Sequence, residues 1–267
     1  MTTAVATIPA PGRVGPLAAI SNTGTLAWRS LVQIKHNPLE LLDFSIQPIM
    51  FVLLFTFVFG GAIAGSTEAY LDFMLPGIIV QNTIFATMYT GMGINADLTK
   101  GVFDRLRSLP IARMAPLAGR ILADTAKQAW AIALLLGVGM ALGFRPHNVA
   151  GVIAGTALML VFALAVAWIA VLVGVTVENG EKVQAYGFTV IFPLTFTSNI
   201  FVPEETMPSW LQAWVEVNPV TILADALRGL MVRGEVLPGP VIQSLLWAVG
   251  IAAVFVPLAL RALRRRT

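Results

Sequence analysis

Side chains that could catalyse a reaction or hold an ion are scarce in this 267-residue chain. There is no cysteine, and the two histidines, His36 and His147, lie far apart in the sequence. This composition excludes a thiol nucleophile and argues against a metal site, because metal sites draw on clustered Cys, His and carboxylate ligands. The chain also lacks the G-x-x-x-x-G-K-[ST] phosphate-binding loop, the G-x-S-x-G nucleophile turn and the H-E-x-x-H zinc motif. We therefore expect no catalytic residue, no metal ligand and no cofactor in the chain itself.

Polar residues inside the long apolar stretches are the next candidates for function. Ion-coupled transport generally needs an ionisable side chain near the centre of the membrane, and these stretches carry none there. Near the start of the third stretch, Arg120 is spaced to pair with Asp124, and Asp124 with Lys127, on one helix face. Uncharged polar groups in membranes commonly hydrogen-bond neighbouring helices, but some line cavities. The candidates for a pathway lining are Gln81, Asn82, Asn95, Thr195, Thr197 and Asn199.

The segment 97–113, DLTKGVFDRLRSLPIAR, combines charge with a helical stripe of apolar residues. We predict an amphipathic helix there that ends at Pro110. Such a helix can lie on the membrane, or it can dock into a groove on a partner. The basic residues alone favour the first reading, because they also fix topology. The residues assigned to docking are Leu98, Val102, Phe103, Asp104, Arg105, Leu106, Arg107, Leu109 and Pro110.

Residues 27–43 precede the first apolar stretch and predict a second amphipathic helix, broken at Asn37-Pro38. Trp28, Leu31 and Val32 fall on its apolar side. We expect this helix to lie in the cytoplasmic interface of a membrane. It serves either as a simple anchor or as an elbow that touches a partner, and the pattern does not separate the two.

Residues 203–235 lie between the last two apolar stretches and predict two short helices separated at Asn218-Pro219. Trp210 and Trp214 share a face of the first helix, as expected for an aromatic belt at the membrane surface. Asp225 and Arg228 have the i,i+3 spacing of an ion pair on the second helix. This outer hairpin is re-entrant or lies on the surface, and it could also act as a lid.

The overall composition places these segments in a membrane. Only 12% of the residues are charged and the mean hydropathy is +0.81, whereas soluble domains carry roughly 25% charged residues. We predict an all-α integral membrane protein with a tail at 1–26, a single membrane domain at 27–262 and a basic tail at 263–267. Because a helix needs about 20 apolar residues to span the bilayer, six transmembrane helices are expected, at about 44–65, 73–96, 117–143, 149–176, 183–203 and 236–260.

The basic residues predict the orientation of these spans. With the N-terminus inside, 14 of the 17 Lys and Arg residues fall on the cytoplasmic side. The positive-inside rule therefore places both termini in the cytoplasm and the chain in the plasma membrane. The same rule explains the basic C-terminal tail without nucleic acid, since that tail can meet anionic membrane lipid.

Three of these segments resemble one known family. They are GVFDRLRSLPIAR (Gly101–Arg113) followed by Gly119-Arg120, NPLELL (Asn37–Leu42), and FVPEETMPSWLQAWVEVNPVT (Phe201–Thr221) followed by Leu227–Gly229. Their order is similar to that of type-2 ABC exporter permeases of the daunorubicin-resistance type. The resemblance implies two permease copies, as a homodimer or a heterodimer, and two ABC ATP-binding subunits that carry ATP and Mg. It also implies that the segment 97–113 contacts the ATPase.

We therefore expect a permease subunit that exports an amphipathic or lipophilic small molecule, such as a drug, an antibiotic or a lipid. One alternative is a secondary multidrug transporter, which would need an intramembrane carboxylate. Another is an integral membrane enzyme that modifies lipids, which would need a polar catalytic cluster. A membrane scaffold or channel would not need a docking helix.

Overall fold

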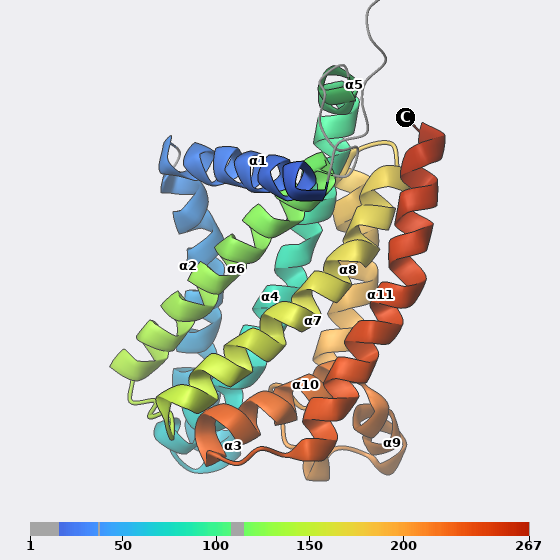
Figure 1. Cartoon of the computed structure of the whole chain (residues 1–267). Coiled ribbons are helices and arrows are strands. Elements are labelled where there is room, and N and C mark those ends of the chain that lie inside the picture. Colours follow the sequence, from blue (N-terminus) through green and yellow to red (C-terminus); the bar gives the residue numbers. More distant parts are fainter. Residues whose placement is uncertain (1–15, 37, 108–114, 267) are drawn as a thin grey trace, which may run out of the picture.

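The computed structural model describes residues 16–36, 38–107 and 115–266, and these residues form helices and connecting turns without a strand. Long helices stand side by side around α4 (Thr67–Thr99), as Figure 1 shows. α4 packs against α2, α6, α7, α8 and α10, and 78% of its most apolar stretch is buried. This burial fits its sequence, which is apolar on all sides as expected for the central helix of a bundle.

Five of the six expected spans are confirmed as helices that are long and apolar enough to cross a membrane. The first runs from α2 (Pro38–Leu54) through a π-helical turn (Phe55–Phe59) into α3 (Gly60–Ala64), with its span at Ser45–Ala64. The others are α4, α6 (Ala115–Ala141), α7 (Val149–Thr176) and α11 (Pro238–Arg266).

The remaining expected span, at 183–203, corresponds to α8 (Gly180–Phe196), which has 17 residues. At 1.5 Å per residue this helix is about 26 Å long, short of the ~30 Å hydrocarbon layer. At the end of α8, hydrogen bonds from Asn218 replace those that a further helical turn would make. The Asn218 amide donates to the carbonyls of Leu194 at 2.8 Å and Thr197 at 3.3 Å. The chain then turns toward a 3₁₀ turn (Glu204–Thr206).

α4 and α7 approach each other backbone to backbone. A Cβ added to Gly174 would lie 2.3 Å from the Gly91 carbonyl oxygen, and one added to Gly91 would lie 2.6 Å from the Ala170 carbonyl oxygen. Small residues allow this kind of approach, which membrane helices use because lipid provides no hydrophobic force between them.

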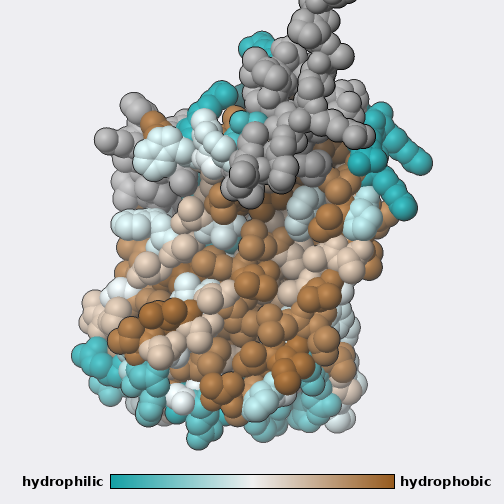
Figure 2. Space-filling model, viewed as in Figure 1, coloured by the Kyte–Doolittle hydropathy of each residue, from teal (hydrophilic) through white to brown (hydrophobic). Residues whose placement is uncertain are grey.

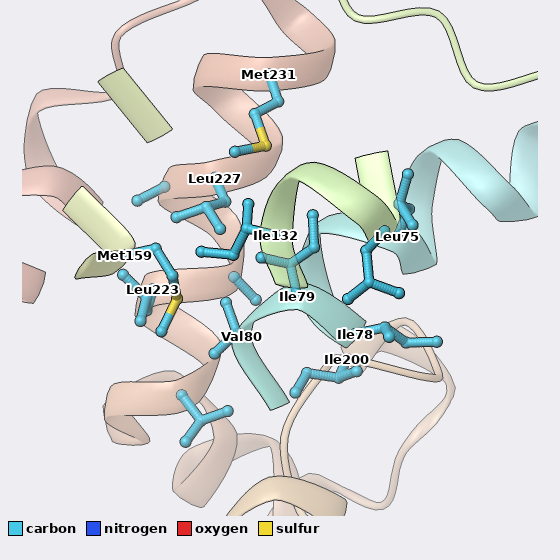
Figure 3. Packing of buried hydrophobic residues seen from close by; sticks show 14 of the residues in the cluster. Leu75, Ile78, Ile79, Val80, Ile132, Met159, Ile200, Leu223, Leu227 and Met231 are labelled. Carbon is cyan, nitrogen blue, oxygen red and sulfur yellow. The ribbon is translucent and has the colours of Figure 1, made fainter. Parts of the chain in front are cut away.

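The largest buried cluster joins α4 to α6, α7 and α10 (Pro219–Arg228). Figure 3 shows Leu75 and Ile79 of α4 beside Ile132 of α6, with Leu223 and Leu227 of α10 close by. α10 is therefore part of the core and not a loosely attached loop. A second, smaller cluster holds the opposite ends of α4, α6, α7 and α11 together.

α1 (Pro16–His36) lies across the top of the bundle in Figure 1, roughly at right angles to the long helices. It begins at Pro16, so residues 16–26, expected in the tail, are helical, and that boundary was wrong. Residues 1–15 lie outside the described structure. α5 (Val102–Arg107) and the end of α11 are at this same end of the bundle. α3, α9 (Ser209–Val217) and α10 lie at the other end.

The surface agrees with a chain that spans a bilayer. In Figure 2 hydrophobic residues dominate the middle of the visible face, and hydrophilic residues gather toward its two ends. Such a large continuous apolar surface is not found on soluble monomers. The chain is thus a multi-pass membrane protein.

Candidate functional site

The expected docking helix is divided in two. Lys100 ends α4 by donating its backbone N–H to Ala96 and Leu98 carbonyls, and Gly101 follows with φ of +67°. Residues other than glycine disfavour that conformation. The predicted apolar stripe is therefore interrupted between Leu98 and Val102, and the prediction of one continuous helix was wrong there.

The two parts of this segment have different surroundings. Leu98 packs against the smaller buried cluster at the end of α4. In α5, Phe103 is buried, Val102 is half-buried and Arg105 is exposed. Leu109 and Pro110 lie outside the described residues, as do the side chains of Asp104, Leu106 and Arg107. The exposed end of the bundle thus carries a separate helix of six residues, reached through a glycine.

α1 rests on α6 at Gly119. A Cβ added there would lie 2.9 Å from Leu26 Cβ and 3.2 Å from the Ala27 backbone nitrogen. Ala27 is buried at this crossing, whereas Trp28 is 68% exposed at its edge. Val32 is half-buried, and the Leu31 side chain lies outside the described part.

The expected charge pairs near the start of α6 are confirmed. Arg120 contacts Asp124 at 3.3 Å, and Lys127 contacts Asp124 at 3.7 Å. Arg120 also reaches Asp97 of α4 at 3.3 Å and lies against Gly93, where an added Cβ would be 1.8 Å from its guanidinium. These charges hold α4 and α6 together at the end near α1.

Two of the polar residues proposed as pathway lining donate hydrogen bonds to backbone carbonyls. The Asn95 amide donates to the carbonyls of Gly174 and Val177, both at 2.9 Å. The Thr195 hydroxyl, fully buried, donates to Ile191 of its own helix at 2.8 Å. These contacts account for the presence of both residues in an apolar bundle.

The other candidates differ in exposure. Gln81 is buried, and Asn82 is half-buried with an amide nitrogen that has no partner among the described residues. Thr197 accepts a hydrogen bond from the Trp214 indole at 2.8 Å. Of the expected belt residues, Trp210 is 74% and Trp214 45% exposed. Asn199 belongs to the network described next.

Arg228 is the best-connected buried charge in the described structure. Its guanidinium donates to the side chains of Asp225 at 2.8 Å and Asn199 at 3.0 Å. It also donates to the Phe73 carbonyl at 2.8 Å and the Asn199 carbonyl at 2.7 Å, and it lies 3.9 Å from the centre of the Phe73 ring. The predicted Asp225–Arg228 pair is confirmed, but no sequence pattern predicted the partners of Arg228 on α4 and after α8.

This network fixes the outer hairpin to the bundle. Burial lowers the pKa of Arg228, and the neighbouring Asp225 carboxylate opposes that shift. Because the charge is removed from water, it depends on these hydrogen bonds. Nearby, burial and the charge of Asp225 raise the pKa of Glu204.

Sequence reasoning missed an aromatic stripe on the side of α8. Phe188, Phe192 and Phe196 are stacked at 5.0 and 4.2 Å between ring centres. The ring of Phe201 extends the stripe, with its centre 5.1 Å from that of Phe196. It also stacks on Phe55 of the first span, at 4.5 Å between ring centres. The i,i+4,i+8 spacing of the first three was a readable signal, whereas the step to Phe55 required the fold.

The stripe borders a surface that the single chain leaves uncovered. Phe188 and Phe192 are 49% and 40% exposed, and Phe188 meets Phe85 of α4 edge-on at 6.1 Å. On the first span an apolar groove of about 350 Å³ is lined by Ile46, Gln47, Met50, Phe51, Leu54 and Phe55. We call the exposed part of α2, α4 and α8 around these residues the aromatic face.

Among the described residues there is no cluster of three His, Asp or Glu side chains that could hold a metal ion. Of the described charges within the spans, Asp97, Arg120, Asp124 and Lys127 pair near one end of the bundle.

Comparison with known proteins identifies the family. Residues 21–232 match the ABC-2 type transporter family. The chain belongs to that family. It is 43% identical over 249 residues, 93% of its length and 88% of the relative's, to the daunorubicin resistance ABC transporter permease protein DrrB1 of Streptomyces coeruleorubidus. It is also 28% identical to DrrC, a probable doxorubicin resistance ABC transporter permease protein of Mycobacterium tuberculosis. That match covers 90% of this chain and 87% of the relative. A putative transport permease, ycf38, of Cyanophora paradoxa is 24% identical over 77% of this chain and 72% of its own length.

The relatives of this ABC-2 family member are named as transport permeases, which agrees with a role as the permease subunit of a transporter. The match includes the three segments on which the sequence resemblance rested, Asn37–Leu42, Gly101–Arg113 and Phe201–Thr221.

Proposed function

We propose that this chain is the membrane subunit of an ATP-driven exporter that moves an amphipathic or lipophilic drug out of the cell. The observation that carries this proposal is the 43% identity, over nearly the whole chain, to a permease named for daunorubicin resistance. An apolar bundle with few charges suits such a solute, since an ion would need compensating groups in the membrane.

In the proposed topology α8, together with the residues that follow it, forms the remaining one of six spans. Both termini are cytoplasmic. α1, α5 and the end of α11 share one end of the bundle in Figure 1. That end carries Arg29, Lys100, Arg105 and Arg264–Arg266, as the positive-inside rule requires for the cytoplasm. In this arrangement α1 lies in the cytoplasmic interface, and the outer hairpin enters the membrane from outside.

The energy comes from a separate ABC ATP-binding subunit, which carries ATP and Mg. We assign its docking to α5 and to residues 108–114 that follow it in the sequence, because α5 lies at the proposed cytoplasmic end of the bundle in Figure 1. A short helix with apolar and charged residues is suited to a groove with a charged rim.

A second permease copy covers the aromatic face, and the solute passes between the two copies. The support is the exposure of Phe188 and Phe192 beside the groove on the first span. Exposed aromatic side chains are typical of surfaces that bind a partner or an apolar ligand. A homodimer and a heterodimer fit this surface equally.

Replacing Leu106 by aspartate should abolish co-purification of the ATP-binding subunit while leaving the membrane bundle folded. A carboxylate placed in an apolar docking groove is left without a partner, at a cost of several kcal/mol. Trp210→Asp is the control, because Trp210 is exposed at the opposite end of the bundle. Equal yields of the complex from both variants would contradict the docking assignment.

Replacing Phe192 by serine should lower ATP-dependent accumulation of doxorubicin in everted vesicles by up to about tenfold, because it removes two stacked ring contacts. The ATPase should still co-purify. Val254→Ser is the control: Val254 is 54% exposed on α11, which packs mainly against α7 and α10. If both variants transport alike, the aromatic face is not the pathway.

The exporter itself is tested by its energy source. Accumulation should require ATP and the partner subunit and should persist when the proton gradient is collapsed. Accumulation by this chain alone, driven by a proton gradient, would establish the secondary transporter instead.

A further inference from the structure

A second groove lies between α1, α6 and α7, away from the aromatic face. It has a volume of about 370 Å³ and is lined by Gly24, Ala27, Trp28, Leu122, Thr125, Ala126, Ala129 and Leu160. In Figure 1, α6 and α7 stand at the front below α1, whereas α8 lies behind them. The groove is therefore not part of the surface assigned to the second copy.

The groove exists because small residues face each other across it. Gly24 has no heavy atom within 4 Å of where its Cβ would lie, so a larger side chain there would extend into open space. A glycine inside a helix costs roughly 0.5–1 kcal/mol relative to alanine. α1 thus keeps this space open although filling it would stabilise the helix.

The walls are mostly hydrocarbon. Two lining residues carry a polar group: the Thr125 hydroxyl donates to the Ile121 carbonyl at 2.8 Å, and the Trp28 indole belongs to a side chain that is 68% exposed at the edge of the groove. A polar ligand inside the groove would therefore lose its hydration without gaining a hydrogen bond from the inner walls. An apolar chain gains by leaving water or by filling a void.

The groove opens onto the part of the surface that lies in the membrane. Its wall residue Leu122 is 50% exposed, and Trp130, about two turns farther along α6, is 54% exposed. Both belong to a membrane-spanning helix. At the other end Trp28 stands at the edge on α1, and exposed tryptophan is typical of the headgroup level. The groove therefore runs from the headgroups inward, the path followed by a lipid tail.

We propose that this groove binds one acyl chain of a membrane phospholipid, which fills the joint between α1 and α6. Protein contact between these two helices is close at Gly119, and the lipid completes the packing beyond that point. The position of α1 on the bundle then depends on the lipid as well as on protein contacts.

The test uses the full chain in vesicles of phosphatidylcholine and phosphatidylglycerol that contain a trace of phosphatidylcholine with a photoactivatable diazirine on its acyl chain. After irradiation, adducts are mapped by mass spectrometry. We expect them at Ala27-Trp28 and at 126–129, above the level on the freely exposed face of α11 around Leu246, which is 65% exposed. Gly24→Leu, which fills the groove, should abolish this excess.

Gly137→Leu is the matched control, because Gly137 also has open space around its Cβ position but lies on α6 outside the groove. It should keep the adducts. Ala129→Phe fills the groove from the opposite wall and should lose them, so the result does not depend on one variant. The proposal would be overturned if labelling in the groove were no greater than labelling on α11. It would also be overturned if Gly24→Leu left the groove labelling unchanged. Crosslinks between two permease chains through this groove would overturn it as well, because they would make a second copy its occupant.

Discussion

Substituting methionine for Arg228 should reduce the stability of the bundle by about 3–5 kcal/mol, the usual cost of breaking a buried ion pair from one side. The loss leaves Asp225 without its cation, and it leaves the buried carbonyls of Phe73 and Asn199 without a donor. The methionine side chain keeps much of the volume, so the effect isolates the hydrogen bonds. Thermal unfolding of the purified protein in detergent measures it.

Two further variants make this result specific. Arg228→Lys retains the charge, but the lysine ammonium lacks the planar guanidinium that reaches four acceptors. We therefore expect an intermediate loss of stability. Arg233→Met removes an exposed arginine five residues away in the same segment and should unfold like the wild type. If Arg228→Met also unfolds like the wild type, the network does not hold the hairpin in place.

Substituting leucine for Gly174 should destabilise the bundle by about 3 kcal/mol, the upper part of the usual range for overpacking. The added Cβ would meet the Gly91 carbonyl oxygen at 2.3 Å, and backbone cannot rotate away as a side chain can. The helices must separate, which also strains the hydrogen bond from Asn95 to the Gly174 carbonyl. We expect reduced yield of folded protein in the membrane and a lower unfolding temperature.

Gly250→Leu on α11 is the control for this change, since no heavy atom lies within 4 Å of its Cβ position. It should be neutral or slightly stabilising, because leucine is a better helix former than glycine. Equal effects of the two substitutions would show that α4 and α7 do not approach as closely as described.

The spans could be predicted from the sequence because lipid imposes one simple rule on length and polarity. Boundaries such as those of α7, expected at 149–176 and found at Val149–Thr176, follow from where charged and turn residues begin. The end of α8 did not follow this rule. It is set by Asn218, more than twenty residues away along the chain, whose amide takes the carbonyls that another helical turn would use.

The candidate site could be predicted only in part, for a similar reason. The spacing of Asp225 and Arg228 was enough to predict their pairing, because both lie on one helix. The contact of Arg228 with Phe73 bridges 155 positions and depends on how α10 enters the bundle. Likewise the hydrogen bond from Asn95 to the Gly174 carbonyl joins two helices and depends on how the end of α7 packs against α4.

The break at Gly101 also decides how the proposed ATPase could move this bundle. Because α4 ends at Thr99 and the chain turns at Gly101, a rotation of α5 about its own axis is not transmitted along one continuous helix. Displacement of α5 toward the bundle would instead be transmitted through the buried side chain of Phe103. The proposed ATPase would therefore act on this permease by pushing α5 and not by rotating it.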